Sequence, residues 1–417
     1  METEPVLGPY RVLDLTDESG FSCGKILADL GADVVKIEPP GGDAARWIGP
    51  FPGDRPDPEK SLYFLSYNAG KRGITLKMDS PAGRDLLKRL ASKADFLIET
   101  YPPGTLERLG IGFDMLRQVN PRLILVSITP FGQTGPYRNY KGSDLIAMAM
   151  SGLMSLIGES GKTPLRVTLP QAPMWAGMYA AAGALTAHYF REATNIGQRV
   201  DVSMQASLLW ALANAPAFWS TNRAVPVRGG SLITGRSITG ARMRGIYQCK
   251  DGYLNFIIYG GKAGRRSNQG LVRWIAERGL SSEKLLNKDW NRFDIETSTQ
   301  TEIDEIEDPA AKLFLLYTKL EFLEEAFRRE IIGYPVANAR DILGDPHLED
   351  REFWRTVDEP SLGLRVKFPG LFARFSEASP APFRPAPRIG QHNLEIYQGE
   401  LGLTGNELAR LHQENVL

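Results

Sequence analysis

Short, mostly apolar runs alternate with longer amphipathic stretches along the first third of the chain. The apolar runs predict buried strands, and they occupy residues 11–15, 33–38, 73–77, 96–99 and 123–129. Between them, apolar positions recur at helical spacing in residues 21–30, 80–93 and, in pieces, 106–119. Because strands that alternate with helices are joined by right-handed crossovers, the pattern predicts an α/β fold with a mostly parallel sheet covered by helices on both faces.

The stretch from residue 164 to 204 predicts a further strand, helix and strand. Residues 165–169 alternate between apolar and polar, residues 174–191 are rich in Ala, Met, Leu and Gly at helical spacing, and residues 198–204 alternate again. The helix contains several small residues, which are Gly177, Ala180, Ala181 and Gly183. We therefore expect this helix to pack closely against another backbone.

The pattern changes after residue 210. A connector is expected at 211–227, a β-hairpin with an Asp-Gly turn at 246–259, and helices at 271–278 and 313–329, with an acidic loop near 302–308 and a last helix at 404–414. We divide the chain accordingly into a large Rossmann-like domain (1–210), a linker (211–227), a small α/β domain (228–334) and a C-terminal segment (335–417).

Composition excludes several classes of protein. The chain has 417 residues, with 49 Lys and Arg against 49 Asp and Glu, so no net charge favours nucleic acid or an anionic membrane. No apolar run reaches the roughly 18 residues of a membrane span. Two cysteines and an acidic N-terminus without signal-peptide features indicate the cytoplasm. The four histidines are far apart in sequence, and no metal site is expected.

The predicted sheet also indicates where a ligand would bind. Ligands of parallel sheets lie beyond the carboxyl ends of the strands, so residues 38–46, 99–104 and 130–141 should surround one mouth. The loop after the first strand, Thr16 to Gly20, lacks the GxGxxG pattern. A nicotinamide cofactor is therefore not indicated.

Several sequence motifs resemble those of the class III CoA-transferases, the family of formyl-CoA transferase and carnitine CoA-transferase, and they follow one another in the same order. They are VLDLT at Val12, LADLGADVVKIEPPGGDAAR at Leu27, NAGKRGITLKMDSPAGRDLL at Asn68, LERLGI at Leu106, NPRLILVSITPFGQTGPY at Asn120, DLIAMAMSGLM at Asp144, GQRVDVSM at Gly197 and DPHLEDREF at Asp345. The resemblance implies a ring-like subunit with a large and a small lobe, a C-terminal segment that returns to the large lobe, and two subunits interlocked as a dimer.

The resemblance also implies CoA or acyl-CoA as a substrate, with no covalently bound cofactor. The residues that match family CoA contacts are Lys71, Arg72, Tyr101, Arg108 and Lys141. The basic side chains suit the phosphates of CoA, and the aromatic ring suits the adenine or pantetheine. The chain departs from the family at Thr100 to Pro102, where an Asn-Phe-Arg phrase is common, and at Pro39, where formyl-CoA transferase has an Arg.

The family chemistry depends on one Asp that this chain lacks. That Asp attacks the acyl-CoA thioester and forms a mixed anhydride and then an aspartyl-CoA thioester. It stands four residues before a helix glycine, which is Gly177 here, so its position is Pro173. The racemase branch of the family needs a His where this chain has Ser143. We therefore assign no catalytic residue. A second difference is that the glycines of residues 228–245 are scattered, whereas formyl-CoA transferase has a run of glycines in this region.

Three functions remain open. In the first, the chain is the non-catalytic subunit of a heteromeric CoA-transferase, and a homologous partner supplies the Asp; the succinyl-CoA:(R)-benzylsuccinate CoA-transferases of anaerobic toluene degradation, built from two unlike subunits, fit best. In the second, an active homo-oligomer works as a transferase or isomerase through Asp201, Glu159 or Glu18. In the third, the chain binds acyl-CoA without turnover. Met174 and Trp175 are compatible with an aromatic acid and equally with a core position.

Overall fold

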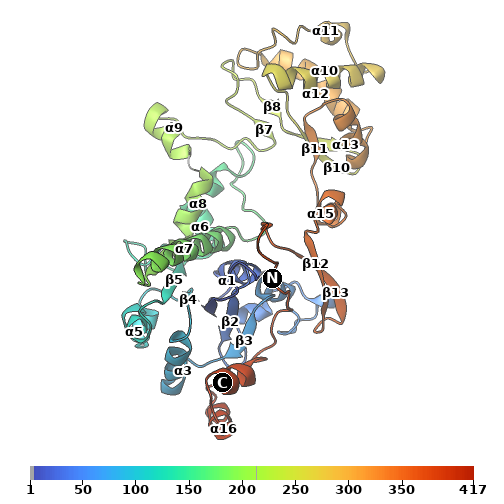
Figure 1. Cartoon of the computed structure of the whole chain (residues 1–417). Helices are drawn as coiled ribbons and strands as arrows, with labels where there is room; N and C mark the ends of the chain where they lie inside the picture. The colour runs from blue at the N-terminus through green and yellow to red at the C-terminus, as the bar shows by residue number, and fades with distance from the viewer. Residues whose placement is uncertain (1–3, 213) are drawn as a thin grey trace. The chain divides into compact units, whose positions relative to one another are not determined.

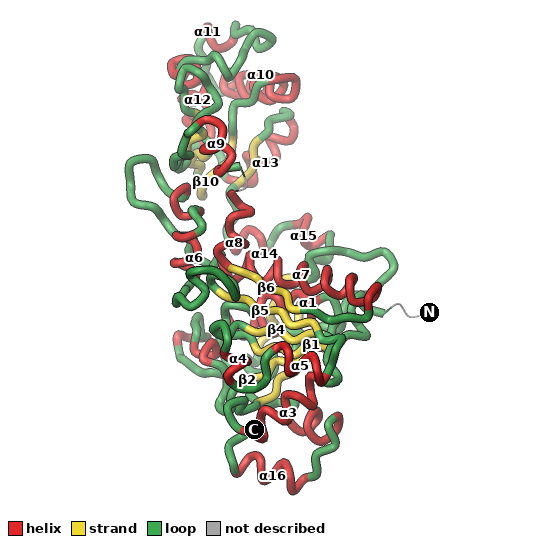
Figure 2. Tube along the Cα trace, turned by 90° about the vertical axis from the view of Figure 1, so that its left-hand side faces the viewer, coloured by secondary structure: helices red, strands yellow, loops and turns green. Residues whose placement is uncertain are grey.

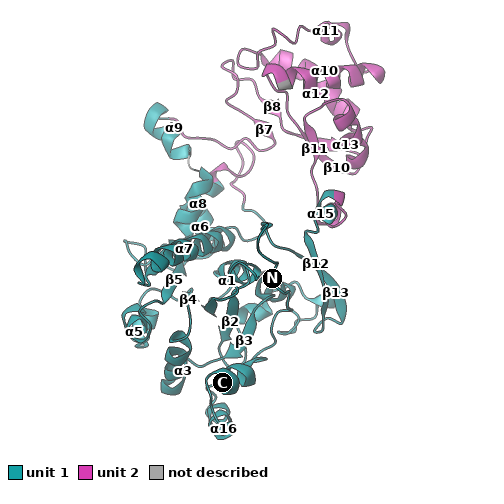
Figure 3. Ribbon diagram, in the orientation of Figure 1, with its two compact units in different colours: residues 1–154, 166–223, 347–417 teal, residues 155–165, 224–346 magenta. Residues whose placement is uncertain are grey.

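The structure is a computed structural model that describes residues 4–212 and 214–417. The chain forms two compact units, which Figure 3 distinguishes by colour. The first contains the described residues of 1–154, 166–223 and 347–417, and the second contains residues 155–165 and 224–346. Each unit has a hydrophobic core of its own.

The helices and strands follow in chain order (Figure 1). They are β1 (Arg11–Leu15), α1 (Phe21–Asp29), β2 (Asp33–Glu38), α2 (Leu62–Asn68), β3 (Arg72–Thr75), α3 (Pro81–Ala91), β4 (Phe96–Glu99), α4 (Thr105–Arg108), α5 (Phe113–Val119), β5 (Ile124–Thr129), α6 (Asp144–Met150), α7 (Ala172–Thr194), β6 (Arg199–Ser203), α8 (Met204–Leu209), α9 (Ala215–Asn222), β7 (Leu232–Ile233), β8 (Met243–Arg244), β9 (Ile246–Cys249), β10 (Gly252–Phe256), α10 (Gly261–Glu277), α11 (Glu283–Leu286), α12 (Gln300–Phe314), α13 (Lys319–Arg328), β11 (Gly333–Pro335), α14 (Ala339–Leu343), α15 (Pro346–Asp350), β12 (Trp354–Glu359), β13 (Leu364–Pro369) and α16 (Gly405–Gln413). Short 3-10 helices and a π-helical turn, Leu394–Glu400, complete the set.

The first unit is built on a parallel sheet of six strands in the order β3-β2-β1-β4-β5-β6 (Figure 2). All neighbouring strands run parallel; Leu13, for example, pairs with Val35 on one side and Leu97 on the other. The strand order reverses between β1 and β4, and such a reversal is where doubly wound sheets open a crevice for ligands. The predicted α/β fold with a mostly parallel sheet is confirmed.

Both faces of this sheet are covered, which explains why its strands are apolar without alternation. On one face, Leu13 and Leu15 belong to a core with α3, α5 and α16 that includes Leu87, Leu116 and Leu411. The other face is covered by α1 and α7. Each fully buried Leu contributes about 1.5–3 kcal/mol through removal of its side chain from water.

Helix α7 approaches α1 very closely at Gly177. A Cβ atom added there would lie 1.8 Å from Ser22 Oγ and 2.9 Å from the Cys23 nitrogen, so only glycine fits without a shift. Gly183 is similarly close to Val200 of β6, at 2.8 Å. The expected close packing of the helix is therefore confirmed at its glycines.

The C-terminal segment covers β3, the outer strand of the sheet. His392 Nδ1 accepts a hydrogen bond from the Gly73 N–H at 3.0 Å, and Asn393 Oδ1 accepts one from the Thr75 N–H at 2.9 Å. The Tyr397 hydroxyl donates to the Thr75 carbonyl at 2.7 Å. The exposed edge of the sheet is thus closed by the chain itself, which satisfies backbone groups that would otherwise invite another strand.

The second unit contains an antiparallel sheet in the order β11-β10-β9, packed on α10, α12 and α13. The predicted hairpin is confirmed, but its turn is formed by Lys250 and Asp251, because Gly252 pairs with Cys249 and begins β10. Trp274, Phe314 and Phe322 form the centre of the core, and each is fully buried.

Four expected elements differ from the structure. Residues 165–169 form no strand, because no neighbouring strand pairs with them, and Leu169 is 71% exposed. The acidic residues 302–308 lie within α12, whose buried face of Ile303, Ile306 and Ala310 holds the helix despite its charge. The helix expected at 313–329 is divided between α12 and α13, and the expected connector at 211–227 contains α9.

Candidate functional site

A cavity of about 600 Å³ opens at the carboxyl ends of β1, β2, β3 and β4, beside the point where the strand order reverses. Its wall comes from the loops that follow these strands and from one residue near the C-terminus. The lining residues are Leu15, Thr16, Asp17, Lys36, Ile37, Glu38, Pro39, Pro40, Asp43, Ala44, Leu76, Lys77, Met78, Asp79, Thr100, Tyr101, Pro102, Leu109 and Asn415. Its size is in the usual range for small-molecule sites.

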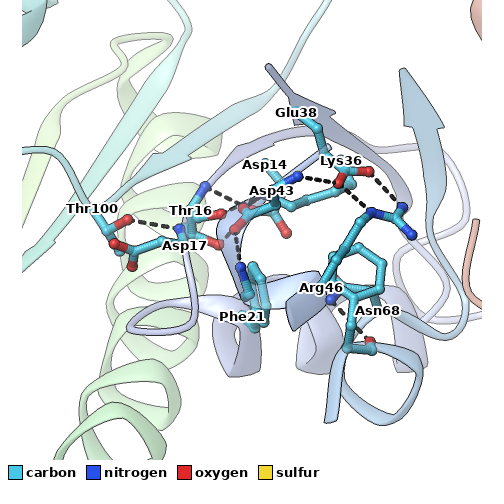
Figure 4. A network of polar contacts seen from close by, with 12 residues as sticks. Asp14, Thr16, Asp17, Phe21, Lys36, Glu38, Asp43, Arg46, Asn68 and Thr100 are labelled. Atoms are coloured by element: carbon cyan, nitrogen blue, oxygen red, sulfur yellow. Dashed lines mark hydrogen bonds and ion pairs between the residues drawn. The ribbon is translucent and has the colours of Figure 1, made fainter. Parts of the chain in front are cut away.

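A buried ion pair lies next to the lining residues Leu15 and Thr16. Asp14, on β1 and labelled in Figure 4, accepts a hydrogen bond from Lys71 Nζ at 2.7 Å, and both side chains are 0% exposed. The other carboxylate oxygen of Asp14 accepts from the Thr16 N–H at 3.0 Å and the Thr16 hydroxyl at 2.6 Å. Burial alone would raise the pKa of Asp14, but Lys71 and Lys36 outweigh it and hold the pKa below its usual value.

Lys36 links the first two strands at the cavity. Its ammonium donates to the Thr16 carbonyl and to Asp43 Oδ2, the latter at 3.2 Å, and lies 5.0 Å from the centre of the Phe21 ring (Figure 4). The side chain is 1% exposed although it borders the cavity. The charge of Lys36 is therefore already shared with groups of the protein.

A second buried pair shapes the loop after β2. Arg46 donates from Nε and Nη2 to the two oxygens of Glu38 at 2.6 and 2.7 Å, a bidentate geometry that fixes both side chains (Figure 4). Arg46 also donates to the Pro387 carbonyl at 2.8 Å and stacks 3.9 Å from the centre of the Phe64 ring. These contacts tie the C-terminal segment to the cavity wall and hold the loop in one conformation.

The segment after β4 forms the opposite wall. The Thr100 hydroxyl accepts a hydrogen bond from the Asp17 N–H at 2.8 Å, which joins this segment to the loop after β1 (Figure 4). The Tyr101 N–H donates to Glu99 Oε2 at 2.6 Å. Burial raises the pKa of the Tyr101 phenol, so this side chain is neutral at physiological pH.

Lys77 lines the cavity, and its ammonium group is available to pair with a ligand. It is half-buried, and among the described residues no ion pair or side-chain hydrogen bond involves its ammonium. Its N–H donates to the Val416 carbonyl at 2.8 Å, so the backbone at this position is fixed. An anionic ligand in the cavity could therefore pair with Lys77 without breaking an existing contact.

The structure brings only one of the five predicted CoA contacts to the cavity. Tyr101 lines it. Lys71 is buried against Asp14, and Arg72 begins β3 at the amino-terminal edge of the sheet, where it pairs with Asp33, Glu395 and Glu400. Arg108 donates to Thr105 Oγ1 at 2.8 Å on an exposed helix, and Lys141 is exposed. The CoA roles of these residues stay predictions.

Sequence reasoning missed Lys36, Lys77 and Asn415 as lining residues. Lys77 ends the strand predicted at 73–77, so the rule that places ligands at carboxyl ends could have found it. Asn415 could not be found in this way, because it reaches the cavity from the other end of the chain. The loop 130–141, expected at the mouth, contributes no lining residue.

The turn at the start of α7 is held from two sides. Asp144 Oδ1 accepts hydrogen bonds from the N–H groups of Gln171 and Ala172 at 2.7 and 2.8 Å, and the Ser22 hydroxyl donates to the Pro173 carbonyl at 3.0 Å. Pro173 lies in the first helical turn, where its missing N–H leaves no bond unmade. This turn presents no nucleophile of its own.

The three carboxylates that could replace a missing nucleophile differ in surroundings. Glu18 is half-buried, and burial raises its pKa, as does the neighbouring Asp17. Asp201 accepts hydrogen bonds from the Gln133 N–H at 3.0 Å. Glu159 belongs to the second unit and forms an exposed ion pair with Lys162.

Within residues 4–212 and 214–417, no cluster of three or more His, Cys, Asp or Glu side chains could hold a metal ion. In the same part of the chain, none of the helices combines the length and the apolar character needed to span a bilayer.

Comparison with known proteins gives consistent matches along the chain. The model of CoA-transferase family III matches residues 7–393. The chain is 36% identical to the succinyl-CoA:(R)-benzylsuccinate CoA-transferase subunit BbsE of Thauera aromatica, over 93% of this chain and 92% of that protein. It is 33% identical to a formyl-CoA:oxalate CoA-transferase of Streptomyces avermitilis, over 98% of each chain.

The fold also matches solved structures. A CAIB/BAIF family protein from Brucella suis superposes with a TM-score of 0.80 at 27% identity, covering 95% of this chain and all of that chain. This similarity extends through both units and supports the arrangement of elements within each.

Proposed function

The chain belongs to CoA-transferase family III, and from this we propose that it takes part in the transfer of CoA between carboxylic acids, with the acyl-CoA held at the carboxyl ends of β1 to β4. The cavity there is preformed, because the loops around it are fixed by the buried Asp14–Lys71 and Glu38–Arg46 pairs. Lys77 offers a cation to a phosphate, and Tyr101 offers an aromatic wall. A cytoplasmic location is part of this proposal.

We propose further that this chain does not supply the nucleophile. Pro173 occupies the start of α7, and the turn from Gln171 to Trp175 contains no carboxylate, thiol, hydroxyl or imidazole. This observation carries the proposal, because covalent transfer through an acyl-carboxylate requires a carboxylate oxygen at that point. The Asp144 carboxylate nearby accepts two backbone N–H groups through one oxygen, which makes it a cap of the helix.

The missing group would then come from a homologous subunit interlocked with this one. The similarity to a subunit of succinyl-CoA:(R)-benzylsuccinate CoA-transferase supports a heteromer and makes an aromatic dicarboxylic acid the preferred acceptor. In this assignment the donor is succinyl-CoA. Met174 and Trp175, both half-buried beside the turn, would contribute an apolar surface for an aromatic ring.

A trapping experiment tests this division of work. The purified chain is incubated with succinyl-CoA, treated with borohydride or hydroxylamine, and analysed by intact mass and by the mass of modified peptides. We expect no adduct on this chain alone, and an adduct on the partner's Asp when a homologous Asp-bearing subunit is added. CoA exchange by the chain alone, or an adduct on any of its carboxylates, would refute the non-catalytic role.

A second candidate is an active transferase or isomerase that uses Glu18. Its place next to Asp17, which lines the cavity, together with its partial burial and raised pKa, favours Glu18 over Asp201 and Glu159. The same experiment separates the two proposals, since the modified peptide would contain Glu18 and the adduct would be absent in Glu18→Gln. If CoA binds and neither chain nor mixture turns over, the chain is an acyl-CoA-binding protein.

A further inference from the structure

A buried carboxyl group lies directly behind the cavity wall and has no role in the proposal above. Glu99 is the last residue of β4 and is 2% exposed. In the sheet it lies between Leu15 of β1 and Ser127 of β5. An ionisable group in this position is costly to bury without a partner, so its contacts call for an explanation.

Glu99 holds the backbone of the cavity wall. Its Oε2 atom accepts the Tyr101 N–H at 2.6 Å, a short bond of the kind that charged acceptors make. Tyr101 lines the cavity, and the next residue, Pro102, has no N–H of its own. The Thr100 hydroxyl fixes the same segment to Asp17 from the other side. The Glu99 carboxyl group therefore holds the backbone that carries the Tyr101 ring.

The positive charge near Glu99 offsets the negative charge of its carboxylate only in part. Arg199 on β6 is the nearby cation, but its guanidinium also contacts Glu107 of α4 at 3.4 Å and Gln133 Oε1 at 2.6 Å. Among the described residues, no ion pair includes Glu99. Burial accordingly raises the pKa of Glu99 to about 7, opposed by the Ser127 hydroxyl, the Tyr101 N–H and Arg199, and assisted by Glu107.

We propose that Glu99 is a positioning residue of the CoA cavity, which orients Tyr101 and couples the binding of an anionic ligand to the uptake of a proton. The inference rests on the proposed CoA site. A phosphate anion in the cavity disfavours a second negative charge behind the wall, so the ligand binds better when Glu99 is neutral. The carboxylic acid retains a carbonyl oxygen for the Tyr101 N–H, and therefore the wall keeps its shape in both states.

The coupling predicts a measurable pH dependence. Above the pKa of Glu99 the free protein has lost the proton that Glu99 carries in the complex, so binding requires proton uptake. Affinity for the ligand therefore falls as pH rises through about 7. For a ligand charge within about 10 Å of Glu99, we expect affinity to fall roughly tenfold between pH 6 and pH 8.5. In Glu99→Gln, which keeps the side-chain carbonyl, this fall should disappear.

The test is calorimetric titration of the full chain with dephospho-CoA from pH 6 to pH 8.5. This ligand lacks the 3′-phosphate of CoA, which itself titrates near neutral pH, so proton uptake reports on the protein. Runs in two buffers of different ionisation enthalpy measure the uptake in the wild-type chain without any variant. Glu107→Gln, a nearby exposed carboxylate, is the matched control.

We expect proton uptake near pH 7 in the wild type, uptake at lower pH in Glu107→Gln because Glu107 assists in raising the pKa of Glu99, and none in Glu99→Gln. Binding without proton uptake, or with the same pH dependence in Glu99→Gln, overturns the inference and leaves the CoA site standing. Failure of dephospho-CoA and CoA to bind at any pH refutes the CoA site, and the inference with it. If Glu99→Gln does not fold, uptake is measured in Glu18→Gln, the other carboxyl group near the cavity with a raised pKa; uptake that persists there supports the inference, and uptake that disappears overturns it.

Discussion

Replacing Lys71 by Met tests whether this lysine stabilises the fold or binds a ligand. In the structure the Lys71 ammonium is fully buried, with Asp14 Oδ2 at 2.7 Å, Asn68 Oδ1 at 2.9 Å and the Phe21 carbonyl at 3.2 Å. Lys71→Met leaves the Asp14 carboxylate buried without its cation. Removing one partner of a buried pair costs about 3–5 kcal/mol in the free energy of unfolding, a large share of the roughly 5–15 kcal/mol that stabilises a typical protein.

Urea unfolding followed by circular dichroism measures this loss, with Lys77→Met as the matched control at a half-buried, unpaired lysine. The pKa of Asp14 is lowered in the folded chain, so its contribution is present above its unfolded pKa of about 3.9 and is lost as pH falls further. Without Lys71, burial raises the pKa of Asp14 in the variant, so the difference in stability between wild type and Lys71→Met should begin to narrow above pH 4 and continue to narrow below it. A Lys71→Met variant that keeps its stability within about 1 kcal/mol but loses CoA binding would refute this reasoning.

Three other changes follow from the same contacts. Lys77→Met should weaken CoA binding about ten- to a hundredfold in calorimetric titration, through loss of one charge-assisted contact, with unfolding unchanged; unaltered affinity would remove Lys77 from the site. Gly177→Ala should lower stability by about 1–3 kcal/mol in urea, because the new Cβ meets Ser22 Oγ, and Ser22→Gly should restore part of the loss. Arg46→Ala should destabilise by about 3–5 kcal/mol by leaving Glu38 buried and unpaired, and a loss below about 1 kcal/mol would contradict the buried pair.

Local patterns predicted most of the elements because their causes are local. Ser80 and Pro81 indicate a helix start, and in the structure the Ser80 hydroxyl accepts the Gly83 N–H at 2.9 Å. The Asp251-Gly252 pair indicates a hairpin, and β9 and β10 do form one, with Gly252 opposite Cys249 and the turn one residue earlier, at Lys250 and Asp251. In each case the deciding contact lies within a few residues of the signal.

The same patterns failed where a distant neighbour was needed. Residues 165–169 alternate like a strand, but a strand exists only when another strand pairs with it. The acidic composition of 302–308 suggested a loop, and the burial of Ile303 and Ile306 against the core of the second unit makes it helical. Among the described residues, a pairing partner is absent at 165–169, and packing outweighs the charge of the segment at 302–308.

The sequence by itself determined the α/β class, the family and the absence of a nucleophile at Pro173, since these follow from local periodicity, ordered motifs and residue identity. Only the tertiary structure decided which charges are free to meet a ligand. Lys71 and Lys77 are six positions apart and chemically alike, yet one is paired with a carboxylate 57 residues away and the other faces the cavity. Contacts between residues far apart in the sequence determine whether a lysine is buried and whether it is paired with a carboxylate. Burial and pairing then decide whether its ammonium group stabilises the protein or binds a ligand.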